Sequence, residues 1–242
     1  MLTTTKGIVL NYINYSETSV IAKVYTEQYG LQSYIVKGIR KNKSKTKLSL
    51  LEHLSLIEIV AYHKENTSSI RTVKELKCIY RFQSIPYDIG KSSIALFINE
   101  ILYKSLHEEE KNPALFDFLF HSIQILDVIT EHYADFHLLF MVQYSKYLGF
   151  FPRNNYNTNN SFFNLNEGVF QAVQPLNAEY VDYPLSEIIN KMLSVSFQDI
   201  TCLNIKKNDR RLLLDKMILF YRFHHSGFNK INSHLILQEV LG

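Results

Sequence analysis

Residues 7–38 read GIVLNYINYSETSVIAKVYTEQYGLQSYIVKG, and this stretch decides the fold. It holds three short runs rich in β-branched and aromatic residues, which is typical of β-strands. The runs are GIVLNY (7–12), SVIAKVYT (19–26) and LQSYIVKG (31–38), and the turn-forming segments NYSET and EQYG separate them. The sequence therefore predicts three neighbouring strands of a compact sheet.

Two more strand-like runs follow within the first third of the chain. They are LSLIEIVAY (Leu54–Tyr62) and SSIRTVKEL, which begins at Ser68. Five short strands close together predict a small barrel of the OB type, a common platform for single-stranded nucleic acid. We therefore expect residues 1–80 to form an OB-fold nucleic-acid-binding domain.

Between the third and fourth predicted strands lies a basic segment, KGIRKNKSKTK (37–47), which contains no acidic residue. It has no apolar periodicity, so we expect a solvated loop. Phosphate contacts neutralise charge without reading bases, so such a loop predicts salt-sensitive binding without sequence specificity. An ordinary surface loop with no ligand is the alternative. The basic residues of the loop are Lys37, Arg40, Lys41, Lys43, Lys45 and Lys47.

Other residues of the predicted strands could extend this basic patch. The candidates are Lys23, Arg71 and Lys74, with Lys77 less well supported. Tyr25 and Tyr34 lie on neighbouring predicted strands and could stack on bases. They could equally pack in the core of the barrel, because aromatic residues are common throughout the chain.

The charge of the chain is unevenly distributed along its 242 residues. Residues 1–80 hold 12 Lys and Arg against 6 Asp and Glu, whereas residues 81–242 hold 14 against 17. This asymmetry favours an anionic partner for the N-terminal part.

The cysteines, Cys78 and Cys202, are far apart and form no paired motif, which argues against a disulfide framework. With no signal-like N-terminus and no apolar run long enough to span a membrane, we expect a cytoplasmic protein.

From Pro86 onward the apolar residues recur at helical spacing, for example at Ile94, Phe97 and Ile101. Residues 81–242 are therefore expected to form an α-helical domain, which makes the fold class α+β. Asn-rich residues 154–166 predict an irregular insertion at about 150–175. The predicted helices begin near Pro86, open at Asn112 with Pro113, and then cover about Ala134–Leu148, Leu185–Val195, Asn208–His225 and Ser233–Leu241.

Motifs for catalysis or metal binding are incomplete. Gly90-Lys91-Ser92 resembles the end of a phosphate-binding P-loop, but Ile85 stands where the first glycine should be. His107-Glu108 begins a zinc-protease motif whose second histidine is missing. No histidine has a recognisable nucleophile partner. The sequence therefore favours a binding protein over an enzyme, with no metal and no cofactor.

Several stretches together resemble the bacterial DNA repair protein RecO family over nearly the whole chain. They are residues 7–30, YIVKGIRKNKSKTK (34–47), NEILYKSLHEEEKNPALFDFLFHSI (99–123) and RRLLLDKMILFYRFHHSGFNKINSHLILQEVLG (210–242). The resemblance implies an N-terminal OB domain, a helical C-terminal domain and the role of recombination mediator. It also implies binding to single- and double-stranded DNA, annealing of complementary strands, and loading of RecA, together with RecR, onto DNA coated by single-stranded DNA-binding protein.

Carried over residue by residue, the resemblance places DNA contacts at Lys37, Arg40, Lys41 and Lys43. Many members of the family also hold zinc with four cysteines after an LG-F-P segment. Here YLGFFPRNNYNTNNSFFNLNEGVF (147–170) keeps the surrounding pattern without a cysteine, so zinc is not expected. We expect the aromatic side chains of the insertion, Phe162, Phe163 and Phe170, to hold it together instead.

Two functions of other classes compete with this interpretation. One is an OB-fold RNA-binding or translation-associated module, which would prefer the 2′-hydroxyl of RNA and would not anneal strands. The other is a nuclease, which would need clustered acidic metal ligands, whereas the acidic residues of this chain are dispersed.

Overall fold

The structure is a computed structural model that describes residues 1–39, 48–63, 70–228 and 230–241. It divides into two compact units. The first comprises Met1–Gln83 with Leu102–Gln124, and the second comprises Ser84–Ile101 with Ile125–Gly242. Helices α1 and α2 each contribute to both units. The expected domain boundary at residue 80 stays a prediction.

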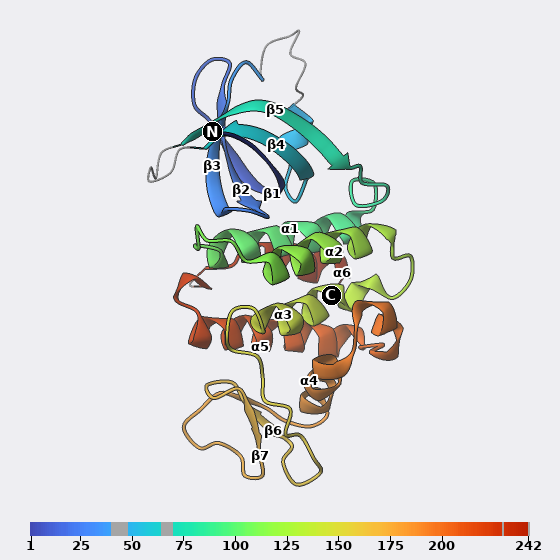
Figure 1. Ribbon diagram of the computed structural model, residues 1–242. Coiled ribbons are helices and arrows are strands. Elements are labelled where there is room, and N and C mark those ends of the chain that lie inside the picture. The colour runs from blue at the N-terminus through green and yellow to red at the C-terminus, as the bar shows by residue number, and fades with distance from the viewer. Residues whose placement is uncertain (40–47, 64–69, 229, 242) are drawn as a thin grey trace. The chain divides into compact units, whose positions relative to one another are not determined.

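The first unit is built on a five-stranded sheet, which can be followed in Figure 1. The strands pair in the order β1-β2-β3-β5-β4, and β4 pairs back to β1, so the sheet closes into a barrel. All of these pairings are antiparallel except that of β3 with β5. The predicted α+β fold is confirmed. The strands are β1 (Leu2–Asn14), β2 (Val20–Thr26), β3 (Gly30–Val36), β4 (Leu56–Tyr62) and β5 (Arg71–Tyr80), and the 3₁₀ turn η1 (Leu48–Leu51) precedes β4.

The inside of the barrel is filled by alternate residues of its strands, as the period of two requires. On β2 these are Val20, Ala22 and Val24, and on β3 they are Tyr34 and Val36. The residues between them, such as Lys23 and Ile35, therefore point outward. Once the inner residues are known, this alternation identifies the residues of each strand that lie on the outer surface of the barrel.

The two tyrosines that could have stacked on bases are both buried. Tyr34 lies inside the barrel, where its hydroxyl is 3.3 Å from Nε2 of His63. Tyr25 is on the outer side of β2, but its ring packs against Phe116, with the ring centroids 6.2 Å apart. Packing in the core, rather than base stacking, is therefore the interpretation that the structure supports.

Residues Leu102–Gln124 are held against the turn between β2 and β3. The Leu31 amide donates to the Glu108 carbonyl at 2.9 Å. Gly30 has a φ of +59°, and a Cβ atom there would lie 2.4 Å from the Glu110 carbonyl oxygen. Only glycine tolerates both this backbone conformation and this close approach.

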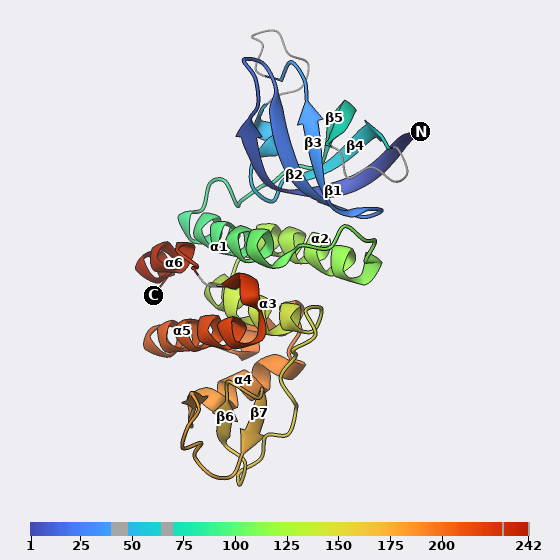
Figure 2. The same cartoon turned by 90° about the vertical axis from the view of Figure 1, so that its left-hand side faces the viewer.

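The second unit is a helical bundle around α3, whose side chains are almost all buried. A helix that is apolar on every side must be covered on every side. Helix α5 lies beside α3 in both views (Figures 1 and 2), and the Tyr221 hydroxyl donates to the Met141 carbonyl at 2.6 Å. None of the described helices is long and apolar enough to cross a membrane. The helices are α1 (Ile89–Ser105), α2 (Pro113–Val128), α3 (Phe136–Ser145), α4 (Leu185–Ser194), α5 (Lys207–His224) and α6 (Ser233–Leu241), with 3₁₀ turns η2 (Tyr133–Asp135), η3 (Phe197–Cys202) and η4 (Ser226–Phe228).

Two buried polar side chains, those of Asp135 and Lys91, hold together segments next to the ends of these helices. The carboxylate of Asp135 accepts from Arg210 Nε at 2.7 Å and from the Ile205 amide at 3.0 Å. Lys91 is only 3% exposed, and its ammonium donates to the Ser84 hydroxyl at 2.6 Å and to the Asp127 carbonyl at 2.8 Å. The lysine of the rejected P-loop match is thus satisfied by groups of the protein itself.

The insertion between α3 and α4 carries a small antiparallel sheet in the order β7-β6-β8, with β6 (Phe162–Asn164), β7 (Val169–Gln171) and β8 (Tyr180–Val181). Phe163 and Phe170 are buried, with ring centroids 4.9 Å apart. Phe163 also packs on Phe220 of α5 at 5.7 Å. Asn155 donates to the Phe170 carbonyl and accepts from its amide, at 2.9 and 3.0 Å. Aromatic packing holds the insertion, as expected, and one asparagine pins its backbone.

Replacing Gly30 tests the contact between the β2–β3 turn and residues Leu102–Gln124. Gly30→Ala should lower the free energy of unfolding by about 3 kcal/mol, because the strain of positive φ costs roughly 1–2 kcal/mol and the overpacking roughly 1–3 kcal/mol. Gly149 is the matched control, since its φ is +85° but nothing lies within 4 Å of its Cβ position. Gly149→Ala should cost about 1 kcal/mol by strain alone. Urea unfolding of the two variants measures the difference, and equal losses would contradict the close approach at Gly30.

Candidate nucleic-acid interface

The candidate interface lies on the outer face of strands β2 and β3. Lys23 points outward from β2, opposite Ser33 of β3. Its ammonium lies 4.9 Å from the centre of the Tyr103 ring, so the aliphatic stem of the lysine is held along the surface. A phosphate could still meet the ammonium from the solvent side.

Lys37 and Lys74 lie just beyond the short parallel pairing of β3 with β5. The pairing joins Tyr34 to Arg71 and Ile35 to Thr72, Lys37 directly follows the end of β3, and Lys74 lies two residues after Thr72 in β5. Both lysines are exposed. Lys74 lies at the β-bulge of β5 that interrupts its pairing with β4. Two exposed basic residues that are far apart in the sequence thus lie beyond the same end of the β3–β5 pairing.

Arg71 is directed away from this face. It pairs with Tyr34, an inward residue, and its guanidinium donates to the side-chain carbonyl of Gln32, which is buried. The charge of Arg71 also helps burial to lower the pKa of His63 to about 4. Arg71 is thus part of a polar group at one mouth of the barrel, where sequence alone had grouped it with the surface lysines.

The remaining predicted DNA contacts are Lys77 and the other basic residues of the loop. Lys77, the weakest candidate, forms ion pairs with Glu75 at 3.4 Å and with Glu58 at 4.0 Å, so acidic neighbours compensate its charge. The other basic residues of the loop lie outside the described residues. These are Arg40, Lys41, Lys43, Lys45 and Lys47.

Sequence reasoning missed an apolar row on the same face. Ile13 pairs with Ile21, and Ile21 pairs with Ile35, so three isoleucines cross three neighbouring strands at one level. All three point outward, because their neighbours along each strand face the core. In the sequence they look like core residues, since β-branched residues favour strands on either face. Only the observed alternation distinguishes them.

Comparison with known proteins agrees with this architecture. Residues 1–82 match the family described as Recombination protein O N terminal, and residues 86–230 match Recombination protein O C terminal. The chain belongs to the RecO family. It is 37% identical over 237 residues to the DNA repair protein RecO of Flavobacterium psychrophilum, with 98% of each chain covered. It is 35% identical over 240 residues to that of Phocaeicola vulgatus and 33% identical over 240 residues to that of Azobacteroides pseudotrichonymphae, with 99% of each chain covered.

Membership of the RecO family makes this a DNA repair and recombination protein, and it gives the basic face of the barrel a DNA-binding context. Within the described part of the chain, no three His, Cys, Asp or Glu side chains come together as a group that could hold a metal ion. In the insertion where many relatives are expected to carry zinc, the described residues pack through their aromatic rings.

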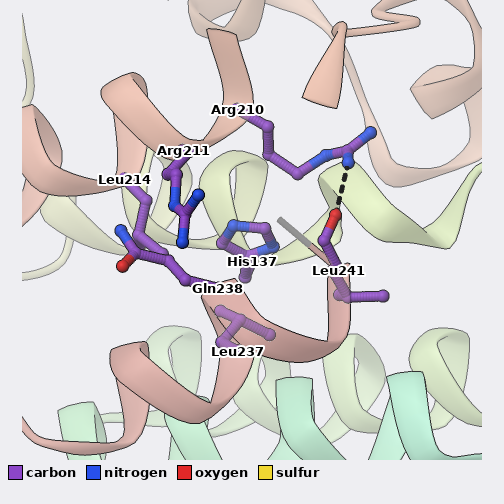
Figure 3. A pocket seen from close by; sticks show the side chains of 7 residues that line it. All are labelled: His137, Arg210, Arg211, Leu214, Leu237, Gln238 and Leu241. Carbon is purple, nitrogen blue, oxygen red and sulfur yellow. Dashed lines mark hydrogen bonds between the residues drawn. The ribbon is translucent and has the colours of Figure 1, made fainter. Parts of the chain in front are cut away.

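A second feature of interest is a small groove in the helical unit, shown in Figure 3. Its floor is apolar and its rim carries the guanidinium of Arg211, which is exposed. Arg210 is already occupied, because it binds Asp135 and donates to the Leu241 carbonyl at 3.0 Å. The lining comes from three helices: His137 of α3, Arg210, Arg211 and Leu214 of α5, and Leu237, Gln238 and Leu241 of α6.

His137, at the back of this groove, is buried and has at least one ring nitrogen without a hydrogen-bond partner. Burial, helped by the nearby charge of Arg210, lowers the pKa of His137 from 6.5 to about 3, although the Ala134 backbone opposes the shift. The folded protein therefore keeps this imidazole neutral.

The lowered pKa of His137 predicts a pH-dependent stability. Between pH 6.5 and 3 the unfolded chain binds a proton at this residue and the folded chain does not, so the free energy of unfolding falls as the pH falls, by up to about 1.4 kcal/mol per pH unit. His137→Leu should remove about 2 kcal/mol of the loss between pH 7 and pH 5. Urea unfolding at both pH values measures it. His63 remains in both proteins, so parallel pH profiles would show that His137 is not buried in its neutral form.

Proposed function

We propose that this RecO family protein is a recombination mediator. It binds single- and double-stranded DNA without sequence specificity, anneals complementary strands, and with RecR helps load RecA onto DNA coated by single-stranded DNA-binding protein. It does so without catalysis or nucleotide consumption, in the cytoplasm at the nucleoid. The observation that carries the proposal is the cationic outer face of the barrel, where Lys23 points outward from β2 and the exposed Lys37 and Lys74 follow the paired residues of β3 and β5.

Annealing follows from charge neutralisation. Two DNA strands repel one another along their phosphates, and the repulsion is screened over about 10 Å at 0.1 M salt. A basic surface replaces the condensed counterions of both strands and lets them approach, while the bases stay available for pairing. Charge neutralisation at the phosphates is therefore the whole of the proposed chemistry.

The DNA contacts that we propose are Lys23, Lys37 and Lys74 together with the basic residues of the loop. Residues 1–51 carry basic side chains with only Glu17 and Glu27 as acidic residues, so little opposes a phosphate there. Arg71 is the least suited of the predicted contacts, because Gln32 binds its guanidinium on the inner side of the barrel.

The double variant Lys37→Ala/Lys74→Ala tests the basic face. It should bind single-stranded oligonucleotides of any sequence more weakly, with the slope of log affinity against log salt reduced by roughly 0.7 per lost contact. Annealing of two complementary oligonucleotides should slow in parallel. Lys77→Ala is the control, because acidic neighbours already compensate Lys77. Unchanged salt slopes, or a preference for RNA with no annealing, would contradict the proposal.

Recruitment to coated DNA requires a contact with the coating protein. We propose that the groove of Figure 3 receives the acidic, apolar tail of single-stranded DNA-binding protein. Arg211 is exposed at the rim of the groove and matches a carboxylate of that tail in charge, and the apolar lining of Leu214, Leu237 and Leu241 lies next to it.

Arg211→Ala separates recruitment from annealing. It should slow the annealing of strands coated with single-stranded DNA-binding protein by roughly 10-fold, because a charge-assisted hydrogen bond of about 1.5–3 kcal/mol is lost. Annealing of bare strands should not change. Arg222→Ala is the matched control, since Arg222 is an exposed arginine of the same helix that does not line the groove. Equal effects on coated and bare strands would reject the groove as the docking site.

A further inference from the structure

The apolar row on the outside of the barrel is unusual because part of it is exposed to solvent. Ile13 is 58% exposed, and Ile21 and Ile35 are half-buried. Tyr15 directly follows β1, two residues beyond Ile13, and is 61% exposed. Its amide donates to the Ser19 carbonyl at 3.0 Å, and this hydrogen bond holds the backbone of Tyr15 next to the end of the β1–β2 ladder. An aromatic ring and three aliphatic side chains thus share one rigid surface.

This surface is continuous because of the register. Neighbouring strands lie about 4.8 Å apart, so the row from Ile13 to Ile35 extends over about 10 Å. Tyr15 lies two residues beyond Ile13, next to the end of β1, on the side towards Lys37. Contiguous exposed apolar patches of this kind mark interaction sites.

The charges around the row point to the nature of the ligand. Lys23 lies on one side of the row along β2, while Lys37 and Lys74 lie on the other side along β3 and β5. None of the outward residues from β1 to β3 is acidic. The nearest acidic residues in the sequence are Glu17 in the β1–β2 turn and Glu75, which follows Lys74 and forms an ion pair with Lys77. The exposed or half-buried outward residues between Asn11 and Lys37 on this face are Asn11, Ile13, Tyr15, Ile21, Lys23, Ser33, Ile35 and Lys37.

We propose that this row is a platform for the unpaired bases of single-stranded DNA. Tyr15 stacks on one base, the three isoleucines form the floor under its neighbour, and the flanking lysines bind the phosphates on either side. The inference rests on the proposed function and adds to it a preference for single strands. In a duplex the bases are stacked on one another and cannot lie on the protein, so the duplex is held by the lysines alone.

The composition of the row fits a ligand of any base sequence. Aromatic stacking is tolerant of sequence because every base has a π-face. Aliphatic side chains add area without hydrogen bonds that would select one base. Neither group obstructs the edges by which a base pairs with a complementary strand.

The chain contains no tryptophan, which permits a direct test with the full-length protein. Tyr15→Trp keeps an aromatic ring at the position and introduces a single tryptophan. A base stacked on this ring should quench its fluorescence when a thymidine oligonucleotide is added. A duplex oligonucleotide, or an abasic oligonucleotide with the same number of phosphates, should bind without quenching. Tyr87→Trp is the matched control, because Tyr87 is 85% exposed and lies in the helical unit.

A second variant measures the contribution to affinity. Tyr15→Ala should weaken binding of the thymidine oligonucleotide by about 10-fold, because stacking on one base is lost. Binding of the duplex should change less than about twofold, since its phosphate contacts remain. Fluorescence anisotropy of labelled oligonucleotides gives both affinities, and circular dichroism confirms that the variant is folded.

The outcomes separate this inference from the proposed function. Normal DNA binding by Tyr15→Trp without quenching would overturn the base platform and leave the mediator role intact. Equal losses of single-strand and duplex affinity in Tyr15→Ala would overturn it as well. A tryptophan signal that responds to RecR but not to the oligonucleotide would assign the row to a protein partner instead. Absence of any DNA binding by the unaltered protein would remove the proposed function itself.

Discussion

The parallel pairing of β3 with β5 is the constraint on which the N-terminal unit depends. It is short, with Tyr34 opposite Arg71 and Ile35 opposite Thr72, whereas the antiparallel ladders around the rest of the barrel are longer. Without it the sheet would be open, with β3 and β5 as unprotected edges. Closing the barrel buries Tyr34 and the other inward residues of β3 in its interior. A barrel of this kind has no free edge, so its interactions must come from its outer face and its loops.

The same pairing determines which charges meet on the surface. In the sequence, Lys37 directly follows β3 and Lys74 lies in β5, with β4 between them. Because β3 and β5 run parallel, both lysines lie beyond the same end of the pairing, whereas an antiparallel register would place Lys74 towards the opposite end of β3. The basic face is therefore a property of the topology as much as of the composition.

Much of the fold could be predicted because the period of apolar residues follows the geometry of each element. The five strands were expected from runs of β-branched residues, and α6 was expected at Ser233–Leu241 as observed. The prediction for α3 was too long at both ends, because η2 and a tight turn flank the helix with residues that are also apolar or aromatic. Strand β8, with only Tyr180 and Val181, is too short to produce any period.

The candidate site could be predicted only in part, for a different physical reason. Composition identified the lysines, since charge is visible in the sequence, but it could not say which side of a strand faces water. Arg71 was therefore grouped with surface residues although its guanidinium binds Gln32. For the same reason Ile13 and Ile35 were not recognised as surface residues, because an isoleucine on the outer face has the same sequence signature as one in the core.

A mediator has a further requirement that this face can meet: it must release the strands that it brings together. On the proposed function, a base leaves the protein when pairing and stacking in the new duplex are more favourable than contact with the barrel. Stacking on one aromatic ring contributes about 1–3 kcal/mol per base, and an aliphatic floor contributes only through buried area. Base stacking in a DNA duplex contributes about 1.4 kcal/mol per step, before the pairing of the bases is added. Because the apolar contacts are weak and counterions can replace the lysines at the phosphates, each base is more stable in the new duplex than on the protein. A surface rich in oriented hydrogen bonds to the bases would instead hold the strands apart.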